Sequence, residues 1–234
     1  MPTEVTDWPG NQQPLDPEAS EAQIAGLLEM LGSSPRRVLD LGCGIGRVLL
    51  PLAAAGHVVV GIDRDRETLS SCRRSLADTN GEAKLIEMDM CGDWPDDLGR
   101  FDLVCCLGNT FMLMADVDDA VRLLRKVRAA LLTDGSFVID NLPHEYWPEL
   151  TAGNWQSGVS EDGCSQLVWS PDDAVFAIRT GGEVDPDCWQ LKTSDTKLRL
   201  WTSGALRLAC ELSGLSIPEG QVEWRVMVMR SEKT

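Results

Sequence analysis

The chain has 234 residues, of which 43% are hydrophobic, and its 21 Lys plus Arg face 37 Asp plus Glu, a formal net charge of −16. This length suffices for a large core, and α/β folds of this size commonly form a single unit. The negative charge repels phosphate backbones and disfavours a nucleic-acid partner. No run approaches the roughly 18 apolar residues of a membrane span, and no leader pattern opens the chain, so we expect a soluble protein without a membrane partner.

The cysteines bear on the compartment. Eight are present, scattered singly apart from Cys105 and Cys106, and no C-x-x-C pair occurs. Isolated thiols in strands and turns act as small hydrophobic side chains. We therefore expect reduced cysteines and a cytoplasmic location. The sequence does not indicate the oligomeric state.

In chain order, the first predicted elements are an arm and a helix. Residues 1–16 hold three prolines among polar residues, which predicts a flexible arm that either stays disordered or closes over a site or partner. Asp16 suits a helix N-cap and Pro17 the first helical position. The apolar spacing that follows predicts a helix ending at Gly32.

The next segment, residues 38–46, is an apolar run that breaks into three alternate glycines. Glycine has no Cβ and tolerates positive φ, so such a turn can double back and let a ligand approach the main chain. Residues 47–55 then read as a helix and residues 58–62 as a second strand. Asp63 follows 21 positions after Gly42, close to the spacing of about 20 at which dinucleotide folds place an acid on ribose hydroxyls. The segment predicts a βαβ unit that binds a nucleotide.

The glycine spacing separates this turn from the nicotinamide and flavin fingerprint. The spacing is G-x-G-x-G, and Arg47 replaces the last glycine of G-x-G-x-x-G, which allows a helix to pack closely beside a pyrophosphate. The motifs VLDLGCGIG and GIDRD resemble those of the class I S-adenosylmethionine-dependent methyltransferases, over residues of about 36–140. The resemblance implies S-adenosyl-L-methionine as cofactor and S-adenosyl-L-homocysteine as product.

Helices and strands continue to alternate up to residue 140. Helical patterns cover residues 66–77 and 116–132, where Gly135 is expected to stop the second helix, and strand patterns cover residues 83–88, 101–107 and 136–140. With the resemblance, this order predicts an α/β fold: a Rossmann-like, doubly wound, mostly parallel seven-stranded sheet.

In such sheets a ligand lies outside the carboxyl ends of the strands, so the residues that follow each strand form the candidate cofactor site. Free amides at the start of the helix near Arg47 suit the carboxylate of a methionine moiety. By resemblance, Asp89 would accept from the adenine amine and Met90 would cover the ring; an ordinary exposed loop acid is the alternative. The candidate cofactor-binding residues are Asp40, Gly42, Gly44, Asp63, Arg64, Asp89, Met90 and Leu107.

The segment after the fourth strand, Leu107 to Phe111, bears on the substrate. Methyltransferases of adenine and cytosine amino groups carry [N/D]-P-P-[Y/F] there, whereas this chain has Gly-Asn-Thr-Phe, so base methylation is disfavoured. The stretch FDLVCCLGNTFMLM resembles glycine and sarcosine N-methyltransferases and implies a small-molecule acceptor, preferably an amine nitrogen. No matching amino-terminal substrate sequence is present, so glycine itself is not predicted. A turn-forming Asn109 and a core-packing Phe111 are the alternatives.

Residues 143–200 break the alternation with prolines, short apolar runs and turn clusters, which predicts an antiparallel β insertion after the fifth strand. Many class I relatives carry a substrate-covering cap at this place. The segment has ten acidic and four basic residues, a net charge of −6, and five of the eight Trp lie in or beside it. Carboxylates and indole rings that hold a cationic amine are one interpretation, and ordinary sheet packing is the other. The expected organisation is a flexible arm (1–16), a cofactor-binding core (17–142), the insertion (143–200) and a C-terminal helix and strands that complete the sheet (201–234).

Methyl transfer from a sulfonium is a direct displacement, so alignment of the reacting atoms near 3 Å matters more than a strong acid or base. A neutral amine attacks unaided, whereas a hydroxyl usually needs a base. His57 is expected to be structural, ahead of the second strand. His144, after the fifth strand, is the candidate base, with a turn histidine as the alternative. The candidate catalytic residues are therefore His144 and Asn109, and no metal site is expected.

Alternative functions remain open. A small hydroxylated metabolite would make the protein an O-methyltransferase. A module that binds S-adenosylmethionine without turnover would keep the site between Gly42 and Asp63 but have no acceptor. A nicotinamide oxidoreductase is disfavoured by Arg47.

Overall fold

The computed structural model of the chain describes residues 17–140, 152, 155–221 and 226–231. The arm predicted for residues 1–16 lies outside this part of the chain. Among the described residues, no helix is long and apolar enough to cross a membrane. All eight cysteines are free.

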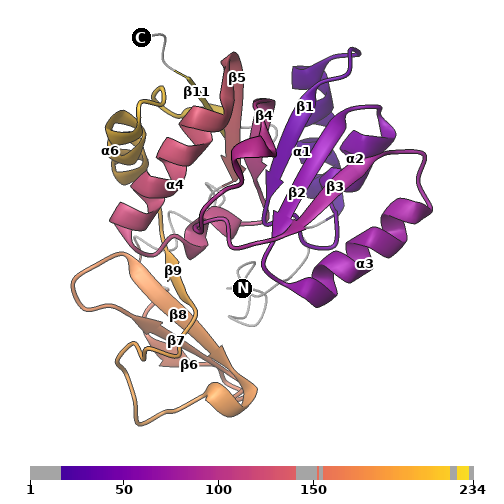
Figure 1. The fold of residues 1–234 in the computed structure, drawn as a ribbon. Coiled ribbons are helices and arrows are strands. Elements are labelled where there is room, and N and C mark those ends of the chain that lie inside the picture. The colour runs from indigo at the N-terminus through magenta and orange to yellow at the C-terminus, as the bar shows by residue number, and fades with distance from the viewer. Residues whose placement is uncertain (1–16, 141–151, 153–154, 222–225, 232–234) are drawn as a thin grey trace.

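The core is a seven-stranded sheet with the order β10-β11-β5-β4-β1-β2-β3 (Figure 1). Strands β1 to β5 run parallel. Strand β11 pairs antiparallel with β5, and β10 pairs antiparallel with β11 at the edge of the sheet. The predicted α/β class, with its Rossmann-like, mostly parallel seven-stranded sheet, is therefore confirmed. The strands are β1 (Arg37–Leu41), β2 (Val58–Asp63), β3 (Ala83–Glu87), β4 (Phe101–Cys106), β5 (Leu131–Asp140), β10 (Glu219–Gln221) and β11 (Val226–Arg230).

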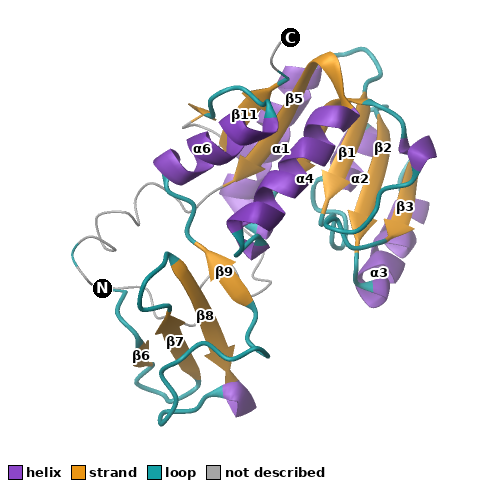
Figure 2. Cartoon of the chain, turned by 60° about the vertical axis from the view of Figure 1, so that its left-hand side comes forward, coloured by secondary structure: helices purple, strands orange, loops and turns teal. Residues whose placement is uncertain are grey.

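Helices cover both faces of this sheet (Figures 1 and 2). One apolar cluster joins α1, α2 and α3 to one face, and a second joins α4 and α6 to the other. The sheet is buried on both sides, which is why its parallel strands are nearly continuous apolar runs. The helices are α1 (Pro17–Leu31), α2 (Leu49–Ala54), α3 (Arg66–Ala77), α4 (Val117–Ala130) and α6 (Ser203–Ser213), with short 3-10 turns η2 (Asp96–Leu98), η3 (Thr110–Leu113) and η5 (Gly181–Glu183).

Local signals set most helix ends where they were predicted. The carboxylate of Asp65 accepts from the Thr68 amide at the start of α3. Asp116 caps α4 by accepting from the amides of residues 118 and 119. Gly32 follows α1 with φ +70°, a conformation that glycine adopts without steric cost.

The start of β5 differs from the prediction. Helix α4 ends at Ala130 and the strand begins at Leu131, ahead of the expected start at Ser136. Gly135 therefore does not stop the helix; it lies within the strand, where a Cβ would come within 2.9 Å of the Phe101 carbonyl oxygen. The ladder between β4 and β5 also shifts register here, between Phe101 and Leu103. Pairing with β4, which the sequence does not show, decides this boundary.

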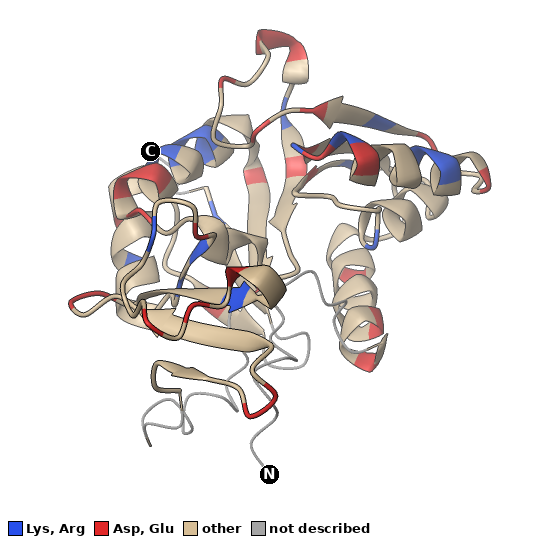
Figure 3. Cartoon of the chain, turned by 90° about the horizontal axis from the view of Figure 1, so that it is seen from below, with Lys and Arg blue, Asp and Glu red and all other residues tan. Residues whose placement is uncertain are grey.

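Some of the basic residues of α4 contact neighbouring loops. The Lys126 ammonium donates to the carbonyl oxygens of Cys91 and Gly92 at 2.6 and 2.5 Å. Arg128 donates to the Gly214 carbonyl at 3.0 Å, just beyond the end of α6, where free carbonyls attract cations. Much of the positive charge of α4 thus fastens neighbouring loops. Acidic positions are spread over the seven-stranded sheet with its helices and over the segment that follows β5 (Figure 3).

A second, antiparallel sheet of four strands follows β5, with the order β6-β7-β8-β9. The predicted insertion is therefore confirmed. Arg199 donates to the Ala115 carbonyl at 2.7 Å, and Met112 of η3 packs into the apolar cluster of the small sheet. Because η3 follows the carboxyl end of β4, the small sheet lies on the ligand side of the core (Figure 1). Its strands are β6 (Gly158–Val159), β7 (Ser165–Trp169), β8 (Val175–Thr180) and β9 (Lys197–Arg199).

Candidate functional site

The three glycines after β1 all have positive φ, +70°, +56° and +95° for Gly42, Gly44 and Gly46. A Cβ on Gly42 would meet Thr110 Cγ2 at 2.5 Å, and one on Gly46 would meet Cys72 Sγ at 2.8 Å. On Gly44 the nearest atom would be 4.0 Å away. The outer glycines are thus required by packing within the chain, whereas Gly44 leaves room for a ligand beside the main chain.

Asp63, at the end of β2, lies across the turn from these glycines. Its Oδ2 accepts from the Gly44 amide and its Oδ1 from the Asp65 amide, both at 2.9 Å. A carboxylate oxygen has two lone pairs, so each oxygen keeps acceptor capacity. The side chain is held in place while able to accept two further hydrogen bonds. Arg64, the next predicted residue, is exposed.

Asp40 of β1 is a buried carboxylate, 3% exposed. Its Oδ1 lies 3.5 Å from the Cys105 thiol, which donates to it. Its Oδ2 is buried and has no hydrogen-bond partner of ordinary geometry in the described part of the chain. Burial raises the pKa of Asp40 to about 6, against the opposing effects of Cys105, the Arg47 cation and the Leu49 amide. An unpartnered buried carboxylate is costly, so the position is suited to a cationic donor from outside the chain.

The residues predicted after β3 and β4 lie in different settings. Asp89 is exposed, and its Oδ1 accepts from the Cys91 amide at 2.8 Å. Met90 is buried in the large apolar cluster, where its carbonyl accepts from the Trp94 indole at 2.8 Å. Leu107 is buried beyond β4, and its carbonyl accepts from the Thr110 hydroxyl. Contacts of these residues with adenine stay a prediction.

Asn109 has φ +57° and is the one non-glycine residue with positive φ among those described. Its amide donates to Asp140 Oδ1 at 2.7 Å, and the Gly108 amide donates to Oδ2 at 2.6 Å. Asp140 was not identified from the sequence. The available signal was an acid that ends a buried apolar strand at the ligand edge, where an unpaired carboxylate is expensive.

Phe111 is a core residue, as one of its two interpretations expected. Its ring centroid lies 5.2 Å from that of Trp201 and 6.3 Å from that of Phe137. Both rings belong to the apolar cluster beneath α4 and α6. Aromatic pairs at these distances stabilise the core beyond the area that they bury.

Of the two histidines, only His57 lies among the described residues. His57 is buried, and its Nδ1 accepts from the Arg36 amide at 3.3 Å. Burial, with the nearby Arg36 cation, lowers the pKa of His57, so the neutral ring is favoured. The structural interpretation of His57 is confirmed. His144 lies outside the described residues, and its role as a base stays a prediction.

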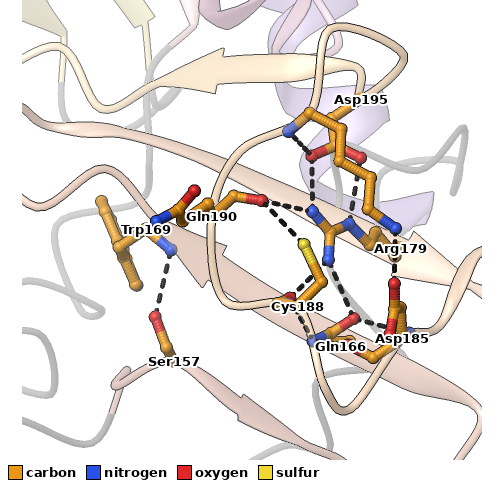
Figure 4. A network of polar contacts seen from close by, with 9 residues as sticks. Ser157, Gln166, Trp169, Arg179, Asp185, Cys188, Gln190 and Asp195 are labelled. Carbon is orange, nitrogen blue, oxygen red and sulfur yellow. Dashed lines mark hydrogen bonds and ion pairs between the residues drawn. The ribbon is translucent and has the colours of Figure 1, made fainter.

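The small sheet holds a buried ion pair on one of its faces (Figure 4). Arg179 is 1% exposed, and its Nε and Nη2 donate to the two carboxylate oxygens of Asp195 at 3.0 and 2.9 Å. Its other donors reach Gln166 and the carbonyls of Cys188 and Gln190. All five guanidinium protons therefore have acceptors, and the loop after β8 is fastened to the sheet.

Three of the ten acids of the insertion form ion pairs within the chain. Asp195 forms an ion pair with Arg179, Asp185 with Lys192, and Asp173 with Arg199. In this structure each of these three acids already has a cationic partner, and the Asp195 pair is buried.

The tryptophans of the insertion fit sheet packing better than a cation site. The rings of Trp169 and Phe176 lie 4.6 Å apart within the cluster that also holds Trp155. Trp189 is exposed, and Trp147 lies outside the described residues. No group of three or more His, Cys, Asp or Glu in the described ranges is arranged to hold a metal ion.

A groove of about 860 Å³ opens away from this site. It lies beside α3 and the amino ends of β1, β2 and β3, with Val58, Leu76 and Ala83 in its lining. Ligands of doubly wound sheets bind at the opposite, carboxyl edge, so the groove is not the candidate site.

Comparison with known proteins agrees with this geometry. Residues 38–135 match a family model described as a methyltransferase domain. The cypemycin N-terminal methyltransferase of Streptomyces sp is 34% identical over 122 residues, which are 50% of this chain and 47% of that protein. A 23S rRNA (uracil(1939)-C(5))-methyltransferase, RlmD, of Shewanella sp. (strain MR-7) is 36% identical over 109 residues, which are 43% of this chain and 23% of that protein. The chain thus spans less than half the length of these curated relatives.

Solved structures match over nearly the whole chain. An S-adenosylmethionine-dependent methyltransferase from Clostridium acetobutylicum ATCC 824 has a TM-score of 0.70 at 14% identity and covers 98% of this chain and 97% of that one. The sugar N-methyltransferase KedS8 from Streptoalloteichus sp ATCC 53650 has a TM-score of 0.63 at 21% identity, with 98% and 94% covered. At these identities the likeness shows the fold.

The sheet order, the glycine turn and the carboxylate opposite it define the class I S-adenosylmethionine-dependent methyltransferase fold. Residues 38–135, which match the methyltransferase-domain model, hold the glycine turn and the Asp63 carboxylate of this fold. The resemblance of its two motifs is thereby confirmed, and S-adenosyl-L-methionine is the cofactor of the class.

Proposed function

We propose that the protein is an enzyme that transfers a methyl group from S-adenosyl-L-methionine to a small-molecule acceptor, preferably an amine nitrogen. The observation that carries the proposal is the presence of two carboxylates, Asp63 and Asp40, beside the glycine turn. Asp63 is held by the Gly44 amide with acceptor capacity left, and Asp40 keeps a buried oxygen without an ordinary partner. The first suits ribose hydroxyls, and the second suits an ammonium group.

The remaining predicted residues complete this site. Gly42 shapes the turn against Thr110, and Gly44 gives the ligand access to the main chain. Arg64, Asp89, Met90 and Leu107 would border the adenosine part, as their places after β2, β3 and β4 suggest. The cofactor supplies an activated methyl group on its sulfonium. The protein's task is then to bind, to exclude water and to align the acceptor.

Asn109 would lie beside the acceptor because its turn follows β4 and contacts the glycine turn through Thr110. The small sheet, packed on η3, would cover the acceptor. An amine that has lost its proton attacks without help, so His144 would be needed as a base only for an acceptor that must lose a proton in the reaction.

Three comparisons support a nitrogen acceptor. KedS8 is described as a sugar N-methyltransferase, CalS10 as an amino pentose methyltransferase, and the cypemycin relative as an N-terminal methyltransferase. The ribosomal RNA relatives match only a fraction of their own length. The net charge of −16 also opposes an RNA substrate. No nucleic-acid or membrane partner is proposed, and the cytoplasmic location stays a prediction.

Calorimetry with S-adenosylmethionine and S-adenosylhomocysteine, followed by transfer assays, tests the proposal. The acceptor panel should hold an aminosugar, a peptide with a free amino terminus, a small amino acid and a phenol. Methylation of an amine is the expected result. Transfer to the phenol alone would indicate O-methylation, tight binding without any product would indicate a binding module, and a folded protein that binds neither compound would overturn the proposal.

A further inference from the structure

Asp140, the last residue of β5, is a buried carboxylate that is not among the candidate cofactor-binding residues. It is 4% exposed and accepts from the Gly108 amide at 2.6 Å, the Asn109 amide at 2.7 Å and the Gln23 side chain at 3.3 Å. Burial raises the pKa of Asp140, against these donors and the Arg47 cation. Both oxygens are engaged by donors of the protein, which favours a role in positioning over one in proton transfer.

The two short bonds fix an unusual turn. Asn109 has φ +57°, in the left-handed region that residues with a Cβ seldom occupy. Consecutive amides that point at one carboxylate hold the peptide between residues 108 and 109 in a single orientation, and bonds to a charged acceptor are the stronger kind. Without the carboxylate, the buried Asn109 amide and the partly buried Gly108 amide would lose their acceptor.

The same carboxylate is linked to the cofactor turn. Gln23 of α1 donates to Asp140 and accepts from Arg47 Nη1 at 3.0 Å. Arg47 directly follows Gly46, the last glycine of the cofactor turn, and also donates to Ser20 at 3.1 Å. A continuous polar chain therefore joins the Asn109 turn to the cofactor turn beneath α1.

We propose that Asp140 is a positioning residue that holds the turn at Gly108 and Asn109 in place relative to the glycine turn, through Gln23 and Arg47. Its role in aligning the acceptor with the methyl donor rests on the proposed function. Alignment is the main requirement of a direct displacement, and a shift of about 1 Å can reduce a rate about a hundredfold. The inference gives the carboxyl end of β5 a specific task in the site.

The test is Asp140→Asn, followed by amide hydrogen exchange and by kinetics. The Asn side chain keeps one acceptor oxygen and turns an NH₂ group toward one of the two amides. We expect exchange at Gly108 and Asn109 to accelerate about tenfold or more because one bond to a charged acceptor is lost. The Gly44 amide, bound by Asp63, should keep its protection. The Kd for S-adenosylmethionine should stay within about threefold, while kcat falls about tenfold or more on the amine methylated fastest by the wild type.

Asp102→Asn is the matched control. Asp102 lies at the amino end of the central strand β4, at the other end of the strands from Asp140. It likewise accepts from a backbone amide, that of Arg37, at 2.9 Å. We expect faster exchange at Arg37 alone, with unchanged kcat and cofactor affinity.

Unchanged protection at Gly108 and Asn109 in Asp140→Asn would overturn the proposal. A parallel loss of protection at Gly44 and of cofactor affinity would also overturn it, because that pattern indicates a general structural role. If Asp140→Asn does not fold, Gln23→Leu, which removes the link to Arg47, should give the same local pattern more weakly, and no change in it would reject the idea. Exchange is measured on the protein alone, so a wild type that fails to bind cofactor refutes the proposed function without deciding this inference.

Discussion

Asp40→Asn should stabilise the free protein and weaken cofactor binding at the same time. Burial raises the pKa of Asp40 from 3.8 to about 6. A carboxyl group with a raised pKa binds more protons in the folded than in the unfolded state between these values, so its ionisation costs stability as the pH rises through this window. At about 1.4 kcal/mol per pKa unit, the full cost is roughly 3 kcal/mol above pH 6.5. Asn does not titrate, so the variant escapes this cost.

Urea denaturation of both proteins at several pH values between 4 and 8 measures the effect. The free energy of unfolding of the variant, relative to wild type, should rise by roughly 3 kcal/mol across the window, or about 6–12 °C in Tm. Taking this difference cancels the titration of Asp140 and of the surface carboxylates. Asp102→Asn, which makes the same carboxylate-to-amide change at a residue that accepts from the Arg37 amide, is measured alongside as the control.

Cofactor binding should change in the opposite sense. An ammonium group prefers the ionised carboxylate, so the affinity of the wild type should fall as the pH drops below about 6. Asp40→Asn should bind S-adenosylmethionine roughly tenfold or more weakly at pH 7.5, since a bond to a charged partner is lost. A stability difference that stays flat with pH would refute the assignment of the raised pKa. Undiminished affinity in the variant would refute the cationic partner.

The remaining predictions concern the glycine turn and the small sheet. Gly42→Ala places a Cβ 2.5 Å from Thr110 Cγ2, so it should lose roughly 2 kcal/mol of stability in urea denaturation. Gly44→Ala meets no such clash and should lose only about 1 kcal/mol from its positive φ, yet it should weaken cofactor binding more than its stability loss explains, as calorimetry would show. Equal cofactor affinity in Gly44→Ala and wild type would argue against a ligand beside that glycine. Arg179→Met leaves the Asp195 carboxylate buried and unpaired, so limited proteolysis should cut the loop after β8 while cofactor affinity persists; the local cost should be roughly 3 kcal/mol. Unaltered proteolysis would show that the ion pair does not fasten this loop.

Elements governed by local chemistry were predicted well. The helix expected at residues 66–77 is α3, because its N-cap Asp65 and its apolar spacing lie within one short segment. The glycine turn is equally local, since three positive φ values at alternate positions demand glycine. The start of β5 was missed because Gly135 responds to the backbone of β4, more than 30 residues away in the sequence.

Polar contacts over long sequence distances explain what else the sequence did not reveal. Asp140 is engaged by main-chain amides of residues 108 and 109, and amide groups carry no sequence signature. The acids of the insertion suggested a cation site because their partners, such as Arg179 for Asp195, become visible only once the strands pair. A count of charges therefore overstated the carboxylates available to a ligand.

Asp40 and Asp140 show how two buried carboxylates on one sheet face divide between binding and positioning. Cys105 pairs with Asp40 on one neighbouring strand and with Val138 on the other, so Asp140 lies two residues further toward the ligand edge of the same face. The Arg47 cation lowers the pKa of both groups against burial. Since hydrogen-bond donors of the chain engage both oxygens of Asp140 but leave Oδ2 of Asp40 without an ordinary partner, only Asp40 gains stabilisation from a bound cation. Cofactor binding should therefore lower the pKa of Asp40 and leave the Asn109 turn already in place for the acceptor.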